Sequence, residues 1–204
     1  MFTVENQPRP ERARFNAVND IIFDDGTVTE PVDLTEVKAF CKLGTGTAED
    51  SILTLLITAA RQQCEQELDR ALITQTWERV IDAFPEVEIE LGVHKVLGIT
   101  SVTYIDAAAA SQVMDSADYS LDADMKGGFL LPAVGTTWPA TLDTTNAVRV
   151  RFTSGYGPTA DLVPGAIKAW ILAKVGDLHP NGDKVTTDQQ ARLDRLLDPF
   201  RIWG

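Results

Sequence analysis

Residues 50–77, DSILTLLITAARQQCEQELDRALITQTW, contain the change of periodicity that decides the fold. In the first part of this stretch, apolar residues recur at the three- and four-residue spacing of a helix: Ile52, Leu55, Leu56, Ala59, Ala60, Cys64 and Leu68. After Leu72 the spacing moves towards two, which is the period of a strand. We therefore predict a long helix, opened by the acidic pair Glu49-Asp50 and packing through this stripe, followed by the first strand of a sheet.

A second, shorter helix is predicted upstream. Asp33 followed three residues later by Glu36 is the pattern of a capping box, in which each side chain bonds the other residue's backbone N–H. Leu34, Val37 and Phe40 then fall on one face. We expect this helix to begin after Asp33 and to end before the glycines at 44 and 46.

The first 30 residues show little regular period. They contain Pro8, Pro10 and the turn residues Asp-Asp-Gly at 24–26. We expect residues 1–30 to form an extended arm with no core of its own and with one short strand near residues 21–23.

Downstream of Leu72, short apolar or alternating segments are separated by turn residues. The candidate strands are residues 74–84, 87–91, 96–105, 119–121, 128–131 and 148–152. Alternation of apolar and charged residues in 87–91 (VEIEL) and 148–152 (VRVRF) is typical of strands with one wet face. The pattern over residues 74–153 therefore predicts a compact antiparallel region of about six short strands.

Two further helices are predicted near the C-terminus. The first begins at Val163-Pro164, carries Ile167, Trp170, Ile171, Val175 and Leu178 on one face, and stops at Pro180. The second is amphipathic and begins at Thr187. This order predicts an α+β fold, a helical bundle of about four helices interrupted by an antiparallel β insertion lobe. The expected parts are the arm (1–30), a helical part (31–73), the β insertion (74–153) and a helical part with a C-terminal tail (154–204).

The composition limits the possible function classes. The 204 residues include 30 acidic and 18 basic side chains, giving a net charge of −12, so most of the surface should repel nucleic-acid phosphates. Apolar runs are interrupted by charge well before the roughly 18 residues of a membrane span, and no membrane contact is expected. With only two cysteines, Cys41 and Cys64, both interpreted as core thiols, folding in a reduced cytoplasm fits best.

Residues for catalysis are scarce. The two histidines, His94 and His179, fall in a turn and at a helix end, where structural roles or simple exposure are expected. Asp118, Asp122 and Asp124 lack the ordered ligand positions of a calcium loop and are interpreted as a solvated loop. We predict no enzyme activity, no cofactor and no metal site; a hydrolase using acidic residues has support only from the abundance of carboxylates.

Glycine-containing turns and aromatic residues are the remaining candidates for functional residues. Gly44-Thr45-Gly46 and Gly155-Tyr156-Gly157 lack phosphate-loop patterns and are expected to permit left-handed backbone angles. Trp77 and Trp170 are expected in the core. At the C-terminus, exposed aromatic residues would reduce solubility, so Phe200, Ile202 and Trp203 should dock on a neighbour or on the chain's own bundle.

Several ordered segments resemble one family, the head-to-tail connector proteins of tailed phages of the adaptor type. They are residues 30–38 (EPVDLTEVK), 50–65, 71–77 (ALITQTW), 99–106 (ITSVTYID), 138–139 (WP), 148–157 (VRVRFTSGYG), 163–168 (VPGAIK) and 197–201 (LDPFR). The resemblance spans residues 30–204 in order, and its specificity lies in the succession more than in any one segment.

The resemblance implies a structural virion protein in the neck, assembled in the host cytoplasm. It implies a ring of twelve copies that binds the portal protein on one side and a stopper or tail terminator protein on the other, around a channel through which DNA passes. As a hypothesis, the portal interface consists of Pro199, Phe200, Arg201, Ile202 and Trp203. The alternative is a tail-associated binding module that recognises a host or carbohydrate target, with Trp138 and Tyr119 as stacking residues.

Overall fold

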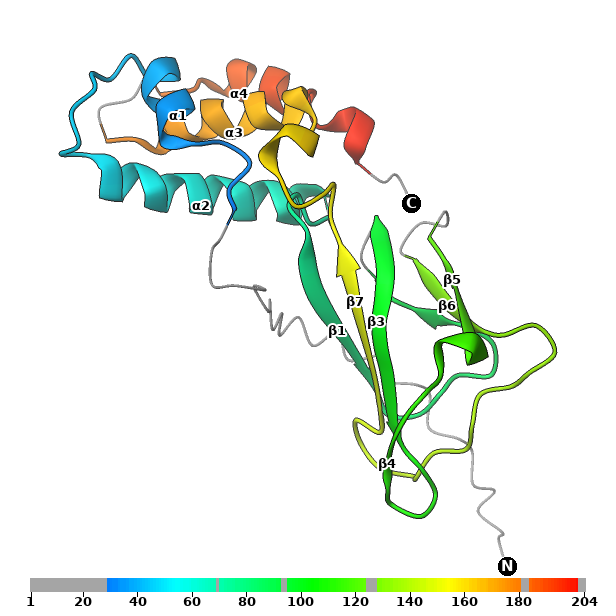
Figure 1. Cartoon of the computed structure of the whole chain (residues 1–204). Coiled ribbons are helices and arrows are strands. Elements are labelled where there is room, and N and C mark those ends of the chain that lie inside the picture. Colours follow the sequence, from blue (N-terminus) through cyan, green and yellow to red (C-terminus); the bar gives the residue numbers. More distant parts are fainter. Residues whose placement is uncertain (1–28, 69, 93–94, 124–127, 181–183, 202–204) are drawn as a thin grey trace, which may run out of the picture.

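Helices gather at one end of the molecule, and long strands extend from them (Figure 1). The computed structural model describes residues 29–68, 70–92, 95–123, 128–180 and 184–201. Within these ranges the α-helices are α1 (Leu34–Phe40), α2 (Asp50–Leu68), α3 (Gly165–Leu178) and α4 (Thr187–Asp194). Short 3-10 helices are η1 (Ser116–Asp118), η2 (Ala160–Leu162) and η3 (Asp198–Phe200). The predicted α+β class is confirmed, whereas the arm, including its strand near 21–23, lies outside the described residues up to residue 28.

The helix starts follow from local capping. Asp33 and Glu36 form the predicted capping box at α1, with Oδ1 of Asp33 accepting from the Glu36 N–H at 2.8 Å. An equivalent box, formed by Thr186 and Gln189, opens α4. These reciprocal bonds satisfy backbone donors that the first turn leaves without partners.

The buried face of α2 differs from the prediction. Leu53, Ile57, Ala60, Cys64 and Leu68 are buried against the rest of the helical layer. Of the predicted stripe, Ile52, Leu55 and Ala59 are exposed. The helix is apolar over more than one face, so the periodicity could not select the face that α3 covers.

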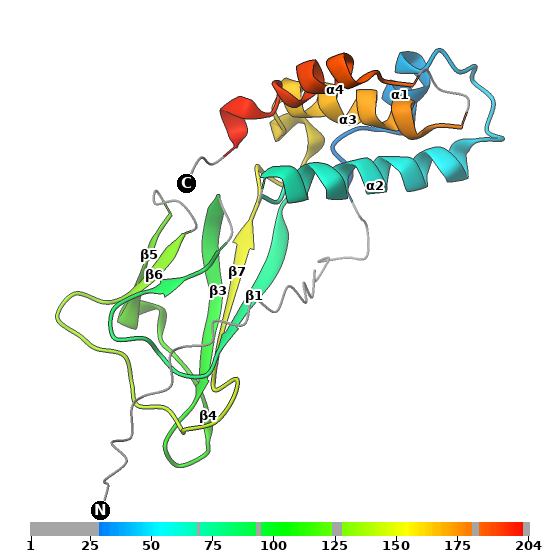
Figure 2. The same ribbon diagram turned by 180° about the vertical axis from the view of Figure 1, so that it is seen from behind.

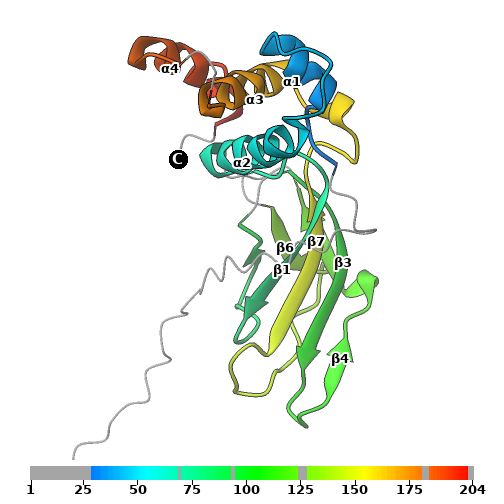
Figure 3. The ribbon, with the colours of Figure 1, turned by 90° about the vertical axis from the view of Figure 1, so that its left-hand side faces the viewer.

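The strands form two antiparallel sheets, and both lie below the helical layer (Figures 1 and 2). The larger sheet has the order β1 (Gln75–Ile81), β7 (Val148–Ser154), β3 (Val96–Ile105) and β4 (Ser111–Val113). The smaller has the order β2 (Ile89–Glu90), β6 (Phe129–Pro132) and β5 (Tyr119–Asp122). Seen from the side, the smaller sheet lies against one face of the larger one (Figure 3).

Two strand predictions need correction. Strand β4 was missed, because its three residues are all exposed and show no apolar alternation. In the segment predicted at 87–91, the strand is limited to Ile89 and Glu90, and the Leu91 N–H donates to the Gly128 carbonyl at 2.9 Å. Val87 is 62% exposed, and its carbonyl accepts from the indole N–H of Trp138 instead of a neighbouring strand.

The buried hydrophobic residues form two clusters. One lies among the helices and includes Val37, Ile57, Trp170, Val175 and Leu197. The other lies between the sheets and is built from alternate residues such as Val102, Leu130, Val148, Val150 and Phe152. Trp170 is fully buried as predicted, whereas Trp77 is only half-buried against the second cluster.

Two apolar residues at helix ends also depart from prediction. Phe40 is 50% exposed and Leu178 is 39% exposed, although both continue the apolar faces of their helices. Each is the last residue of its helix. The ring of Phe40 still lies close to Gly176 of α3, so it is covered on one side only.

Candidate interaction surfaces

Of the residues that could suggest catalysis, the structure describes His179, Asp118 and Asp122. His179 caps the C-terminus of α3, is 2% exposed, and its Nε2 lies 3.8 Å from a carboxylate oxygen of Glu49. Asp118 lies in η1 and Asp122 in β5, while His94 and Asp124 lie outside the described residues. Within the described ranges, the structure shows no grouping of three metal-ligating side chains and no helix long and apolar enough to cross a membrane.

The cysteines differ in burial. Cys64 is fully buried, and burial, aided by the charges of Glu65 and Glu67, raises the pKa of its thiol to about 12. Cys41 is half-buried at the C-cap of α1, and burial raises the pKa of its thiol as well. Both therefore carry neutral thiols near pH 7, as core side chains do.

The C-terminal segment packs on the chain's own helices up to residue 201. Leu197 is fully buried and Phe200 packs against the helical cluster. Arg201 donates from Nη2 to Glu67 of α2 at 3.1 Å and from Nη1 to Asp198 at 3.2 Å. Of the five residues in the hypothetical portal interface, Pro199 is exposed, Phe200 and Arg201 make these contacts, and Ile202 and Trp203 lie outside the described residues.

One face of α2 is largely apolar and lies exposed in the part of the chain that the structure describes. Ile52 is 39% exposed and Leu55 is 66% exposed, and Ala59 continues the same face one turn on. The next positions on this face, Gln62 and Gln66, are exposed and uncharged. We call these five residues the α2 outer face; an apolar helix face of this kind is typical of protein–protein contacts.

A buried polar network joins the helical layer to the sheet. Arg61, only 4% exposed, donates from Nε to Glu30 at 2.8 Å and from Nη1 to Glu65 at 2.7 Å. Oε1 of Glu65 accepts from the Leu72 N–H and from the side-chain amide of Gln75, each at 2.9 Å. Burial raises the pKa of Glu65, although Arg61 and these hydrogen bonds oppose the shift. The sequence pattern did not indicate that Arg61 and Glu65 would pair.

The chain crosses between the helical layer and the larger sheet twice, first between α2 and β1 and again after β7. Gly155 and Gly157 have φ values of 140° and 155°, so their predicted left-handed conformation is confirmed. The prediction is wrong for Gly44 and Gly46, because the left-handed residue in that connection is Lys42. The Thr74 N–H donates to the Gly157 carbonyl at 2.9 Å, which ties the two crossings to each other.

The outer face of the larger sheet carries an ionic cluster that sequence reasoning missed. Glu78 on β1 accepts from Arg149 at 2.7 Å and from Arg151 at 2.8 Å, both on β7. Burial tends to raise the pKa of Glu78, but the two arginine hydrogen bonds outweigh it and the pKa is lowered. Both arginines remain about half exposed. Strand register pairs Glu78 with Arg151, a relation that the sequence alone does not contain.

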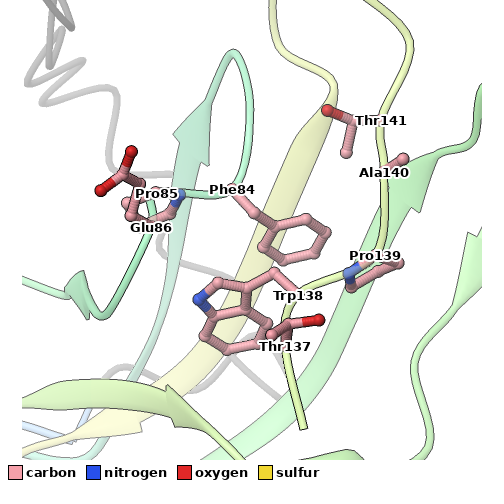
Figure 4. Close-up of a pocket in the computed structure, with 8 residues that line it drawn as sticks. All are labelled: Phe84, Pro85, Glu86, Thr137, Trp138, Pro139, Ala140 and Thr141. Atoms are coloured by element: carbon pink, nitrogen blue, oxygen red, sulfur yellow. The ribbon is translucent and has the colours of Figure 1, made fainter.

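An open pocket lies beside two connections of the β region (Figure 4). The rings of Phe84 and Trp138 stack, with centroids 4.9 Å apart and planes 7° from parallel. Its lining is Phe84, Pro85, Glu86, Thr137, Trp138, Pro139, Ala140 and Thr141. Trp138 therefore already has a stacking partner, and Tyr119 packs against the second hydrophobic cluster. We call this site the Phe84–Trp138 pocket.

Comparison with known proteins identifies the fold. No family model matches the chain, and no curated protein matches it. Among solved structures, a chain in the neck of an empty gene transfer agent (GTA) particle, computed with C6 symmetry, is 21% identical with a TM-score of 0.69, and the match covers 87% of this chain and 94% of that one.

Two further solved structures give similar matches. A chain in the virion of the native GTA particle is 21% identical with a TM-score of 0.68 over 88% of this chain and 94% of that chain. A chain in the neck of the native particle, computed with C12 symmetry, is 20% identical with a TM-score of 0.65 over 83% and 88% of the two chains. The chain therefore shares its fold with chains of these particles over most of its length.

Proposed function

We propose that this chain is a structural subunit of the neck of a tailed-phage-like particle, where twelve copies form an adaptor ring between the portal and the tail. The observation that carries the proposal is the match to a chain in the neck of a GTA particle, because it covers 87% of this chain and 94% of that one. We infer a structural role rather than an enzymatic one.

The α2 outer face supports assembly into a ring. A ring is closed by one repeated head-to-tail contact, so each subunit needs an uncovered surface that a neighbour fits. The side chains of Ile52 and Leu55 are exposed on a helix whose opposite face is already buried. We propose that the neighbouring subunit covers this face.

The net charge of −12 supports a passage for DNA that does not retain it. Acidic side chains repel phosphates, so a wall carrying a share of these residues would let the duplex slide. We propose that part of the acidic surface lines the channel and that a stopper or tail terminator protein binds the side of the ring away from the portal.

Imaging by electron microscopy tests the proposal directly. The purified protein is mixed with the portal ring of the same particle, and the complexes are classified without imposed symmetry. We expect a twelvefold ring bound beneath the portal. Failure of the protein to associate with the portal under all salt and pH conditions tried would refute the proposal.

The portal contact is proposed for Pro199–Trp203. Removing all five residues also removes the packing of Phe200 and the ion pairs of Arg201, so a truncation alone is ambiguous. The paired change Ile202→Ser and Trp203→Ser spares those contacts. Loss of portal binding with unchanged thermal stability is expected; retained binding in both this variant and the truncation after Leu197 would contradict the contact.

A further inference from the structure

We propose that residues 8–14 of the N-terminal arm dock, within the same chain, on the Phe84–Trp138 pocket. The proposal concerns the isolated subunit and does not depend on ring formation. It rests on the shape and chemistry of the pocket, on the charge around it, and on the point from which the arm leaves the described structure.

The pocket combines polar atoms with a wall of ring surfaces (Figure 4). Its walls include two aromatic residues, Phe84 and Trp138, and two prolines, Pro85 and Pro139. The indole N–H of Trp138 donates to the Val87 carbonyl at 2.9 Å, which fixes the ring that Phe84 stacks on. Aromatic-lined grooves of this kind bind proline-containing segments, whose restricted backbone loses little entropy on docking.

The chain segment that begins at the pocket with Glu86 is acidic, and we call Glu86, Glu88 and Glu90 the glutamate border. Glu86 lines the pocket, and Glu88 and Glu90 follow at alternate positions, all three exposed. The stretch 81–91 also contains Asp82 and has no lysine or arginine. Among the residues that the structure describes, no ion pair involves any of these three glutamates. The border therefore favours a cationic ligand.

The arm contains a segment of matching chemistry. Residues 8–14 read PRPERAR and include all three basic residues of the first 30, Arg9, Arg12 and Arg14, against one acid, Glu11. Pro8 and Pro10 in the same segment hold their φ angles near −65°. Two prolines for the aromatic wall and three arginines for the glutamate border thus occur together within seven residues.

The arm is long enough to reach the pocket in the same chain. Glu30 is held at α2 by Arg61, and Arg61 also binds Glu65, which binds Gln75 at the start of β1. The arm therefore leaves next to the start of β1, and the pocket follows the end of this seven-residue strand. Seven residues of strand span about 23 Å. The 16 residues from Arg14 to Glu30 can extend over roughly 50 Å.

Docking within the chain is favoured over docking between chains in dilute solution. A tethered segment experiences an effective concentration on the order of 1 mM, far above that of a second copy at micromolar concentration. Weak individual contacts then suffice to keep the arm on the pocket.

A cross-linking experiment on the full chain tests the proposal. Ala13→Cys and Ala140→Cys place one thiol in the segment and one at the pocket, in a Cys41→Ala background where the remaining Cys64 is fully buried. A short bismaleimide should join the two introduced thiols within one chain, as read from the masses of the intact protein and its tryptic peptides. The matched control, Ala13→Cys with Ala169→Cys on the exposed side of α3, should react far less.

Charge substitutions separate docking from random encounter. Arg9→Ser, Arg12→Ser and Arg14→Ser together should lower the yield of the cross-link within one chain about tenfold, as expected for the loss of three exposed ion pairs. Glu86→Lys, Glu88→Lys and Glu90→Lys should have the same effect, and combining them with three Arg→Glu changes in the arm should restore the yield. A yield that ignores these charges, or a product that joins two chains, would overturn the proposal.

Discussion

At the scale of single residues, burial decides reactivity. Cys64 is fully buried and its thiol has a pKa of about 12, whereas Cys41 is half-buried at a helix end. We predict that iodoacetamide at pH 8 alkylates Cys41 in the native protein and leaves Cys64 unmodified, because only an accessible thiolate reacts. Peptide mass spectrometry measures both sites. In denaturant the two should react alike; equal rates in the native state would contradict the buried position.

Glu65 connects α2 to the chain that leads into the sheet through several hydrogen bonds. Glu65→Ala removes the acceptor of the Leu72 N–H and of Gln75 and one partner of the buried Arg61. We expect a loss of about 3 kcal/mol in the free energy of unfolding, at the lower end for breaking a buried pair because Arg61 keeps Glu30. Urea titration followed by circular dichroism measures it.

The control for Glu65 lies on the same helix. Gln66→Ala changes an exposed neighbour and should alter the free energy of unfolding by less than about 0.5 kcal/mol. Equal effects of the two substitutions would show that the network contributes nothing beyond helix propensity.

At the scale of elements, α2 has two apolar faces and uses one of them within the subunit. Leu55→Asp places a charge on the α2 outer face, where Leu55 is 66% exposed, so the fold should keep its stability. We expect the variant to remain a subunit and to fail to assemble into the ring, since a desolvated charge at an interface is costly. Size-exclusion chromatography with light scattering measures both states.

A conservative change at the same position provides the comparison. Leu55→Met keeps the volume and apolar character and should assemble as the wild type does. Assembly of Leu55→Asp under the conditions in which Leu55→Met assembles would exclude this face from the subunit contact.

The crossing after β7 requires glycine. Gly155 has a φ of 140°, and a Cβ placed there would lie 2.7 Å from the Ile73 carbonyl oxygen. We predict that Gly155→Ala lowers the free energy of unfolding by about 1–3 kcal/mol through backbone strain. Gly46→Ala is the matched control, because a Cβ there meets nothing within 4 Å and the substitution should be neutral or slightly stabilising. Thermal unfolding of the two variants compares them; equal melting temperatures would contradict the strain.

At the scale of the whole molecule, net charge governs contact with nucleic acid. With a net charge of −12, the protein should not retain duplex DNA at about 0.15 M salt, where nonspecific binding depends on cationic surface. Fluorescence anisotropy of a labelled duplex measures this. The variant carrying Glu86→Lys, Glu88→Lys and Glu90→Lys tests whether the charge at this one place changes binding of the duplex. Salt-sensitive binding of the duplex by the wild type would contradict the prediction.

The two hydrophobic clusters also belong to this scale. Helical residues before and after the β region share one cluster, for example Ile57 and Trp170, while the strands between them form the other. The predicted division into an arm, two helical parts and a β insertion agrees with this arrangement but is not tested by it. It stays a prediction about which segments fold as units.

The sequence by itself determined part of the local structure. Capping boxes, glycine turns and alternation act between near neighbours, so the start of α1 after Asp33, the limits of β3 and the burial of Trp170 were all predictable. Only the tertiary structure decided which face of α2 is buried, that Arg61 and Glu65 form a buried network, and that Glu78 faces two arginines. The physical reason is that these outcomes depend on contacts between residues far apart in sequence, which a local period cannot encode.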